Sequence, residues 1–287
     1  MTFDYLRYDV LIKAKILLLW FLLLTVCLPL SFYGQQSESA FHDIHQKEYW
    51  KSYLTDTRDI LVSPATWDAG DWGKFGGLVA AGALVYVYDN EVYDLIQRNK
   101  SDESGWISRN IAEPVGSGLY TLPVLGLFYA CGAVKHDDHK KNIALTGLKA
   151  FTLGLGASVV AKHIFHRHRP CQNDPPDPRR WEGPFTGNWQ KDAFPSSHTT
   201  VAFAVASAIA AGYPEKKWIG VAGYSLAALA GWSRIHDRKH WPSDVFAGAV
   251  LGTYIGVFVS RSNLTSTRTG LTFVQGIPVF SVAYSLN

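Results

Sequence analysis

The stretch GWSRIHDRKHWPSD, residues 231–244, marks the place where two apolar segments of this chain meet. One segment ends near Arg234, and the next begins just after His240, where Pro242 suits the first turn of a helix. Asp244 follows His240 by four residues, so a helical turn brings the carboxylate close to the imidazole. The stretch therefore predicts two consecutive helices, and the connection between them contains basic side chains and histidines that can transfer protons.

Outward from this stretch, the chain contains weakly hydrophobic segments rich in Ala, Gly, Leu and Val. They cover residues 72–88, 115–134, 143–162, 199–212, 217–233 and 244–260. Their length and apolar content predict six helices, and hence an all-α fold with a six-helix core bundle. Small residues let helix axes approach closely, which both membrane bundles and tight soluble bundles require. The composition alone leaves these two alternatives open.

The two ends of the chain differ from the bundle. Basic residues precede an apolar run from Ile16 to Leu30, which is the layout of a secretory signal, with an uncleaved membrane anchor as the alternative. A short amphipathic helix is expected before Pro64, and Phe280, Val282, Tyr284 and Leu286 alternate as in a strand that has no evident partner. We divide the chain into a signal or anchor (1–34), an amphipathic segment (35–71), the helical domain (72–262) and a strand-like tail (263–287).

The charge of the chain argues against a nucleic-acid partner. The formal net charge is +3 over 287 residues, and the lysines and arginines are dispersed rather than gathered in blocks. A local cationic site remains compatible with this composition.

Three clusters of reactive residues lie at predicted helix ends. Lys162 and Arg169 close the third helix, Ser196 can cap the fourth, and Arg234 closes the fifth. In an antiparallel succession, these ends lie on the same side of the bundle. Three fixed cations would there meet the first backbone amides of a helix, those of Ser197 and His198, and both features favour phosphate. The clusters therefore predict a phosphate site.

Two histidines add chemistry to this site. Asp244 can accept the N–H of His240, which leaves the other ring nitrogen free to attack phosphorus. His198, on the opposite side, has an ordinary pKa suited to donating a proton to the leaving oxygen near neutral pH. Taken singly, the basic residues could instead be charges at helix C-termini, Ser196 a plain cap, and His240 with Asp244 a structural pair.

Other polar residues receive a different interpretation. His163, His166 and His168 suggest a metal site, but the neighbouring arginines would repel a cation, and we predict no metal. His236 and Asp237 lie between Arg234 and His240, and we expect them to face solvent or the substrate entrance.

The three motifs together resemble the signature of the type 2 phosphatidic acid phosphatase and vanadium haloperoxidase superfamily. They read Lys162-x6-Arg169-Pro170, Pro195-Ser-Ser-His198 and Ser233-Arg234-x5-His240-x3-Asp244, and the resemblance covers roughly residues 72–260. It implies an all-helical core, a phosphohistidine intermediate at His240 and acid catalysis by His198. It also implies that phosphate is bound by Lys162, Arg169, Ser196, the amide of Ser197 and Arg234. The family has glycine at the position of Ser197, where only a backbone N–H is needed.

The resemblance implies a metal-independent phosphatase without a cofactor, which acts on phosphomonoesters, in particular lipid phosphates or isoprenyl diphosphates, and is inhibited by vanadate. One alternative is a vanadium-dependent haloperoxidase that holds vanadate as its cofactor. Others are a broad-specificity periplasmic acid phosphatase and a non-enzymatic membrane protein. The loops at 89–112 and 171–194 are expected to select the substrate. We expect an exported, membrane-associated body with its site on the periplasmic side, a soluble body being the alternative, and segment 72–88 is the weakest candidate to span a bilayer.

Overall fold

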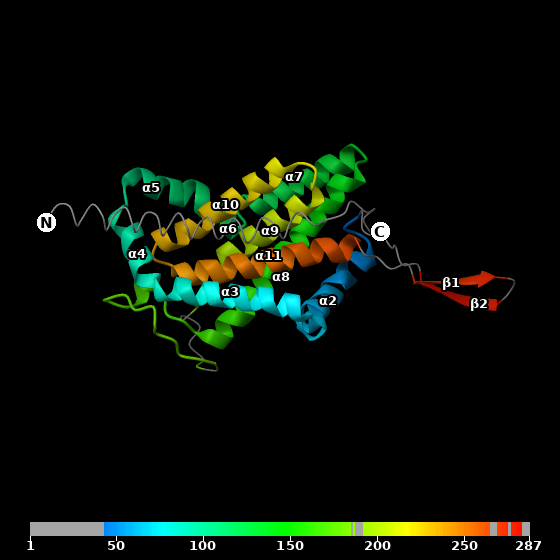
Figure 1. The fold of residues 1–287 in the computed structure, drawn as a ribbon. Coiled ribbons are helices and arrows are strands. Elements are labelled where there is room, and N and C mark those ends of the chain that lie inside the picture. The colour runs from blue at the N-terminus through cyan, green and yellow to red at the C-terminus, as the bar shows by residue number, and fades with distance from the viewer. Residues whose placement is uncertain (1–42, 185, 187–191, 265–268, 275–276, 283–287) are drawn as a thin grey trace.

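The computed structural model describes residues 43–184, 186, 192–264, 269–274 and 277–282, and within them the chain is a helical bundle followed by one hairpin (Figure 1). The main helices are α2 (Lys47–Val62), α3 (Ala69–Val87), α4 (Asp89–Arg98), α5 (Asp102–Ile107), α6 (Glu113–Ser117), α7 (Thr121–Val134), α8 (Asp138–Phe165), α9 (Ser197–Gly212), α10 (Lys217–His236) and α11 (Pro242–Leu264). Short helical turns occupy η1 (Ser63–Thr66), η2 (Ser108–Ala112) and η3 (Pro170–Gln172).

The predicted core helices are present as α3 and α7 to α11, which confirms the all-α bundle. The prediction for 115–134 was wrong in one respect, because Gly118 takes a left-handed conformation, with φ 87°, and separates α6 from α7. Residues 89–112, expected as a loop, instead form α4, α5 and η2. Buried Tyr93 anchors α4 and reciprocal bonds between Ser101 and Ser104 cap α5, so the segment gains both core contacts and helix caps.

A seam of glycines joins α9 and α11. Gly248, Gly252 and Gly256 recur every four residues on α11, so they lie along one face of that helix. A Cβ atom built on Gly252 would lie 2.2 Å from the carbonyl oxygen of Thr200, and one on Gly256 would lie 2.2 Å from that of Ala204. No side chain fits at these positions, so the two helices pack backbone against backbone, and the starts of α9 and α11 are held beside each other.

The predicted amphipathic helix is α2, which packs against α8. The hydroxyl of Tyr49 donates to the carbonyl oxygen of Leu145 at 3.0 Å. Asp56 forms an ion pair with Lys149 at 2.7 Å, and both side chains are buried. This pair lies in the middle of α8, far along that helix from Lys162 in its last turn.

The described helices include candidate membrane spans. By length and composition, α8 and α11 can each cross a bilayer, and the stretch Asp102–Ser117 with Thr121–Val134, bent by 57°, can form a third span. Large apolar side chains are exposed along several helices, among them Trp72 on α3, Leu127 on α7, Val160 on α8 and Trp218 on α10. The described chain thus has the helices of a membrane-associated protein, and α3 is not among the candidates found within it.

The C-terminal strand has a partner, contrary to the sequence analysis. Strand β2 (Ile277–Val282) pairs antiparallel with β1 (Thr269–Val274), with Thr269 opposite Val282 and Val274 opposite Ile277. The β-branched and aromatic residues of TGLTFV supply the second strand. The expected signal or anchor at 1–34, and Tyr284 and Leu286 of the tail, lie outside the described residues.

Candidate active site

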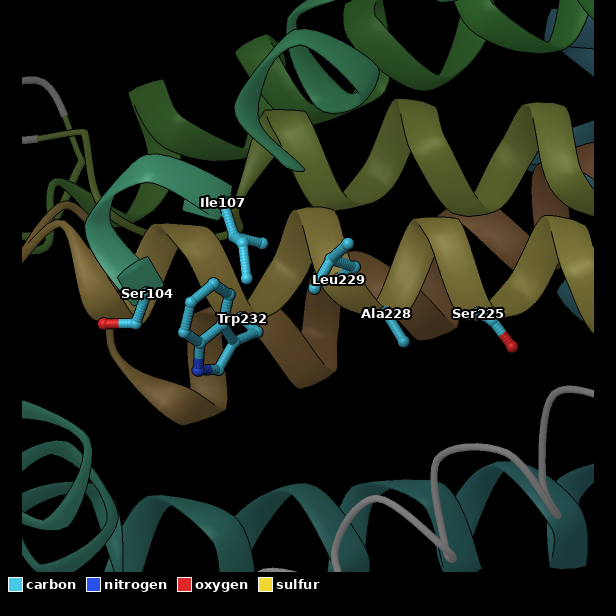
Figure 2. A pocket seen from close by; sticks show the side chains of 6 residues that line it. All are labelled: Ser104, Ile107, Ser225, Ala228, Leu229 and Trp232. Atoms are coloured by element: carbon cyan, nitrogen blue, oxygen red, sulfur yellow. The ribbon is translucent and has the colours of Figure 1, made fainter. Parts of the chain in front are cut away.

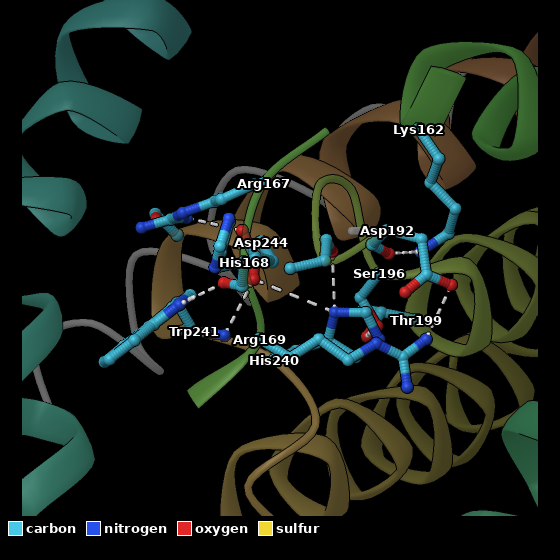
Figure 3. Close-up of polar contacts among 12 residues, drawn as sticks. Lys162, Arg167, His168, Arg169, Asp192, Ser196, Thr199, His240, Trp241 and Asp244 are labelled. Carbon is cyan, nitrogen blue, oxygen red and sulfur yellow. Dashed lines mark hydrogen bonds and ion pairs between the residues drawn. The ribbon is translucent and has the colours of Figure 1, made fainter. Parts of the chain in front are cut away.

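The ends of four helices meet at one end of the bundle, as the succession of motifs predicted. The amide of Ser196, before α9, donates to the carbonyl oxygen of Asp244 in α11 at 3.0 Å, and the amide of His240 donates to that of Arg234 in α10 at 3.1 Å. Lys162 and Arg169, at the end of α8 and just beyond it, both bond to Asp192. Figure 3 shows Lys162, Arg169, Asp192, Ser196 and Asp244 together with His240.

His240 is buried with one ring nitrogen engaged. Its Nδ1 lies 2.6 Å from the carbonyl oxygen of Ala193, and because a carbonyl only accepts, Nδ1 carries the hydrogen and Nε2 keeps its lone pair. Asp244 lies farther away, with Oδ2 3.7 Å from Nδ1. The Nδ1–H of His240 was expected to bond to Asp244, but it donates to the backbone carbonyl of Ala193 instead. Burial, with the nearby cations Lys162 and Arg169, lowers the pKa of His240 to about 4, so the ring is neutral at pH 7.

The three expected cations already have acidic or carbonyl partners. Lys162 donates to the backbone oxygen of Asp192, and Arg169 pairs with the Asp192 carboxylate at 2.8 Å. Arg234 pairs with Asp237 at 3.2 Å and with Glu113 at 3.7 Å. Among the described side chains, the Nε atoms of Arg169 and Arg234 are nevertheless buried without a hydrogen-bond partner. Two arginines thus keep a donor available for an anion.

The first turn of α9 presents backbone amides to the same site. Ser196 is its N-cap residue and is buried, but its hydroxyl makes no capping bond and accepts one from Thr199 at 2.9 Å. Ser197 turns its hydroxyl toward α8, where Ser158 donates to it at 2.8 Å. The serine that replaces the family's glycine therefore keeps its side chain away from the amide, and the helix N-terminus can face an anion.

His198 follows in the first turn of α9. Its Nε2 lies 3.4 Å from a carboxylate oxygen of Glu113, and the side chain is 31% exposed. Burial first, and then Arg234 and His240, lower the pKa of His198 to about 3. The sequence suggested an ordinary histidine pKa, and the difference arises first because the ring is buried and then because positive or protonatable side chains lie near it. Glu113, the carboxylate beside it, lies between the expected loop at 89–112 and the expected helix at 115–134, and no motif assigned it a role.

A second carboxylate and an arginine behind the site were also missed. Arg167 is fully buried and bonds to Asp244 and to Asp89, which is buried as well. Asp89 precedes Arg167 by 78 residues, and no local spacing in the sequence points to such a contact.

The histidines around Arg167 have separate surroundings. His168 lies 2.8 Å from Glu182 and 3.2 Å from Asn173, whereas the rings of His163 and His166 meet edge to face at 6.1 Å. Within the described ranges, no group of three or more His, Cys, Asp or Glu side chains is arranged to hold a metal ion.

His236 and Asp237 were expected to face solvent or the substrate entrance, and the first alternative was wrong for His236. His236 is buried, with Nδ1 2.8 Å from Asp237 and Nε2 3.1 Å from the hydroxyl of Ser104. Asp237 also accepts a bond from Ser108 at 2.9 Å. These bonds connect α5 and η2 to the C-terminal end of α10, and they hold in place the last turn of α10, which contains Arg234.

A shallow groove lies beside this contact, between α5 and α10 (Figure 2). Its volume is about 460 Å³, and its lining is mainly apolar: Ser104, Ile107, Ser225, Ala228, Leu229 and Trp232. None of the cations of the site contributes to it, so the groove is separate from the anion site.

Together, the fold and the site define a helical, membrane-type protein. Its site holds a buried histidine among positively charged side chains that can bind an anion. Residues 144–268 match the model of the PAP2 superfamily, which confirms the resemblance carried by the three motifs. The matched stretch includes every predicted site residue from Lys162 to Asp244.

Curated relatives share shorter stretches. The chain is similar to a lipid A 1-phosphatase of Porphyromonas gingivalis, 42% identical over 66 residues, which are 23% of this chain and 15% of that protein. A lipid A 1-phosphatase of Rhizobium johnstonii is 32% identical over 90 residues, 31% of this chain and 34% of the relative. An undecaprenyl-diphosphatase of Sulfolobus acidocaldarius is 27% identical over 115 residues, 40% of this chain and 52% of the relative. The chain thus spans about half or less of the length of these relatives.

Among solved structures, the crystal structure of Aquifex aeolicus LpxE is similar to 60% of this chain and 94% of its own, with 23% identity and a TM-score of 0.44.

Proposed function

We propose that this protein is a metal-independent phosphatase that hydrolyses phosphomonoesters, in particular lipid phosphates or isoprenyl diphosphates, through a phosphohistidine at His240. The observation that carries the proposal is the state of His240: a neutral ring with Nδ1–H held by the Ala193 carbonyl and Nε2 unprotonated. A ring in this tautomer is a nucleophile without needing a base.

The surrounding groups fit the transfer of a phosphoryl group. Lys162, Arg169 and Arg234, with the first amides of α9, can hold the phosphate oxygens, and the unpartnered Nε atoms of both arginines support this role. Nε2 of His240 attacks phosphorus while the bond to the leaving oxygen breaks, and His198 gives that oxygen a proton. Water then hydrolyses the phosphohistidine, with His198 accepting a proton from the water.

The proposed substrate class is lipid phosphates. Support comes from the apolar, exposed helices and candidate membrane spans, and from the names of relatives that act on lipid A and undecaprenyl diphosphate. We propose a periplasmic-side site; reporter fusions after Arg180 that are active only in the cytoplasm would contradict that placement.

Purified protein with lipid phosphates and isoprenyl diphosphates tests the activity, with chelator present throughout. His240→Ala is expected to abolish turnover, because it removes the nucleophile. Brief reaction with phosphorus-labelled substrate and quenching should trap an acid-labile, base-stable adduct in the wild type and none in this variant. His139→Ala is the matched control, because His139 is exposed at the opposite end of α8. An adduct on a serine, or substantial turnover by His240→Ala, would refute the mechanism.

A further inference from the structure

A buried group of charges lies directly behind Asp244, on the side away from the anion site. Its centre is Arg167, whose guanidinium uses all its donors. Nε and Nη2 donate to the carbonyl oxygen of Pro178 at 3.1 and 2.9 Å, Nη2 donates to Asp89 at 2.6 Å, and Nη1 donates to Ser243 at 2.8 Å and to Asp244. The rings of Trp181 and Tyr86 lie 4.6 and 5.1 Å from the guanidinium carbon. Arg167 is therefore held in one orientation.

Asp89 fixes the other side of the same group. Its Oδ1 accepts the amide of Ser243 at 2.8 Å, and its Oδ2 accepts the hydroxyl of Ser243 at 2.6 Å as well as Arg167. Asp89 thus binds the start of α11, one residue before Asp244. Asp244 uses Oδ1 for Arg167 and Oδ2 for the amide of Trp241 at 2.8 Å, so Oδ2 is the oxygen that faces His240.

The charges of this group do not cancel when both carboxylates are ionised. Arg167 contributes one positive charge, and Asp89 and Asp244 contribute two negative charges, so one negative charge remains. All three side chains are fully buried, and water screens their charges little. The ring of His240 becomes positive when Nε2 bonds to phosphorus, and the remaining negative charge compensates that change. Without Asp89, the charge of Asp244 would be cancelled by Arg167.

We propose that Asp89 and Arg167 are positioning residues that hold the Asp244 carboxylate toward His240. Together, Asp89, Arg167 and Asp244 keep one net negative charge beside the ring during phosphoryl transfer. The inference rests on the proposed phosphatase function for its chemical consequence, whereas its geometry stands on the contacts alone.

Asp89→Asn tests the proposal, because asparagine keeps the shape and can still accept the amide of Ser243. The expected result is a loss of kcat of about 10- to 100-fold with KM within about threefold of wild type, since the group acts on the transition state rather than on binding. Asp56→Asn is the matched control: it also removes the acid of a buried ion pair, with Lys149, but away from the site. Its kcat should equal that of the wild type.

A second measurement does not need turnover. The pKa of His240, followed by NMR of the labelled ring, should fall in Asp89→Asn and rise in Arg167→Gln, each by on the order of one unit. The double variant, in which both charges are removed, should return it toward the wild-type value. Equal kcat in Asp89→Asn and Asp56→Asn, or shifts of the same sign in the two single variants, would overturn the inference. If the wild type hydrolyses no phosphate, the proposed function fails, and the NMR shifts decide this inference alone.

Discussion

Binding of an anion should raise the pKa of His198 enough for the ring to take up a proton. In the structure its pKa is about 3, because the ring is buried and lies near Arg234 and other cations, so it cannot act as an acid at neutral pH. To be half protonated at pH 6.5, the pKa must rise by about 3.5 units, which corresponds to about 5 kcal/mol. A dianion about 4 Å away supplies about 8 kcal/mol at an effective dielectric constant of 20. A bound dianion is therefore sufficient to charge the ring.

Calorimetry with inorganic sulfate measures this coupling, because sulfate stays a dianion across the pH range and takes up no proton itself. The dependence of the binding enthalpy on the ionisation enthalpy of the buffer gives the proton uptake. At pH 6.5 the wild type should take up about one proton per sulfate, and His198→Gln about none. The sign also fixes the pH dependence: sulfate affinity falls as the pH rises through the increased pKa of His198. Equal uptake by the two proteins, or none in the wild type while sulfate binds, would refute the reasoning.

Three further substitutions have expected outcomes. Ser197→Gly should change kcat/KM less than about threefold, because only the backbone amide faces the anion; a larger loss in a phosphatase assay would show that the hydroxyl contributes. Gly252→Ala should lower the free energy of unfolding by about 1 to 3 kcal/mol, because its Cβ would lie 2.2 Å from the Thr200 carbonyl oxygen. Denaturant titration measures this change. An unchanged free energy of unfolding would mean that α9 and α11 can move apart at the glycine seam. Asp192→Asn should lower the KM for substrate, because Arg169 loses a competing carboxylate at 2.8 Å, and a higher KM would assign Asp192 a supporting role in binding.

The sequence was sufficient for the bundle and for which residues converge, because both follow from local patterns. Apolar helices joined in antiparallel order place Lys162 and the first turn of α9 at the same end, whatever the details of packing. The bend after α6 was not predictable in this way, because 115–134 is largely apolar and the helices are separated by a turn at residues 118–120, where Gly118 is left-handed.

The contacts that tune the site were harder to predict. Asp89 meets Arg167 across 78 residues, and Ala193 takes the N–H of His240 from 47 residues away. Such contacts depend on how loops return to the bundle, which periodicity does not encode. The low pKa of His198 likewise arises from burial of the ring and from charged neighbours on other elements, neither of which its own motif reveals.

The glycine seam has a consequence for how such proteins can diversify. It joins the helix that begins with Ser197 and His198 to the helix that begins just after His240, and it does so through main-chain contact that is independent of the side chains on either outer face. The spacing between acid and nucleophile is therefore set by the backbone of two helices. Helices that contribute no residue to the site, such as α2 and α7, can therefore be exchanged between relatives without changing that spacing. Asp89 at the start of α4, and Arg167, Asp192 and Ala193 in the connection between α8 and α9, contact the site's side chains and have to stay in any such chimera.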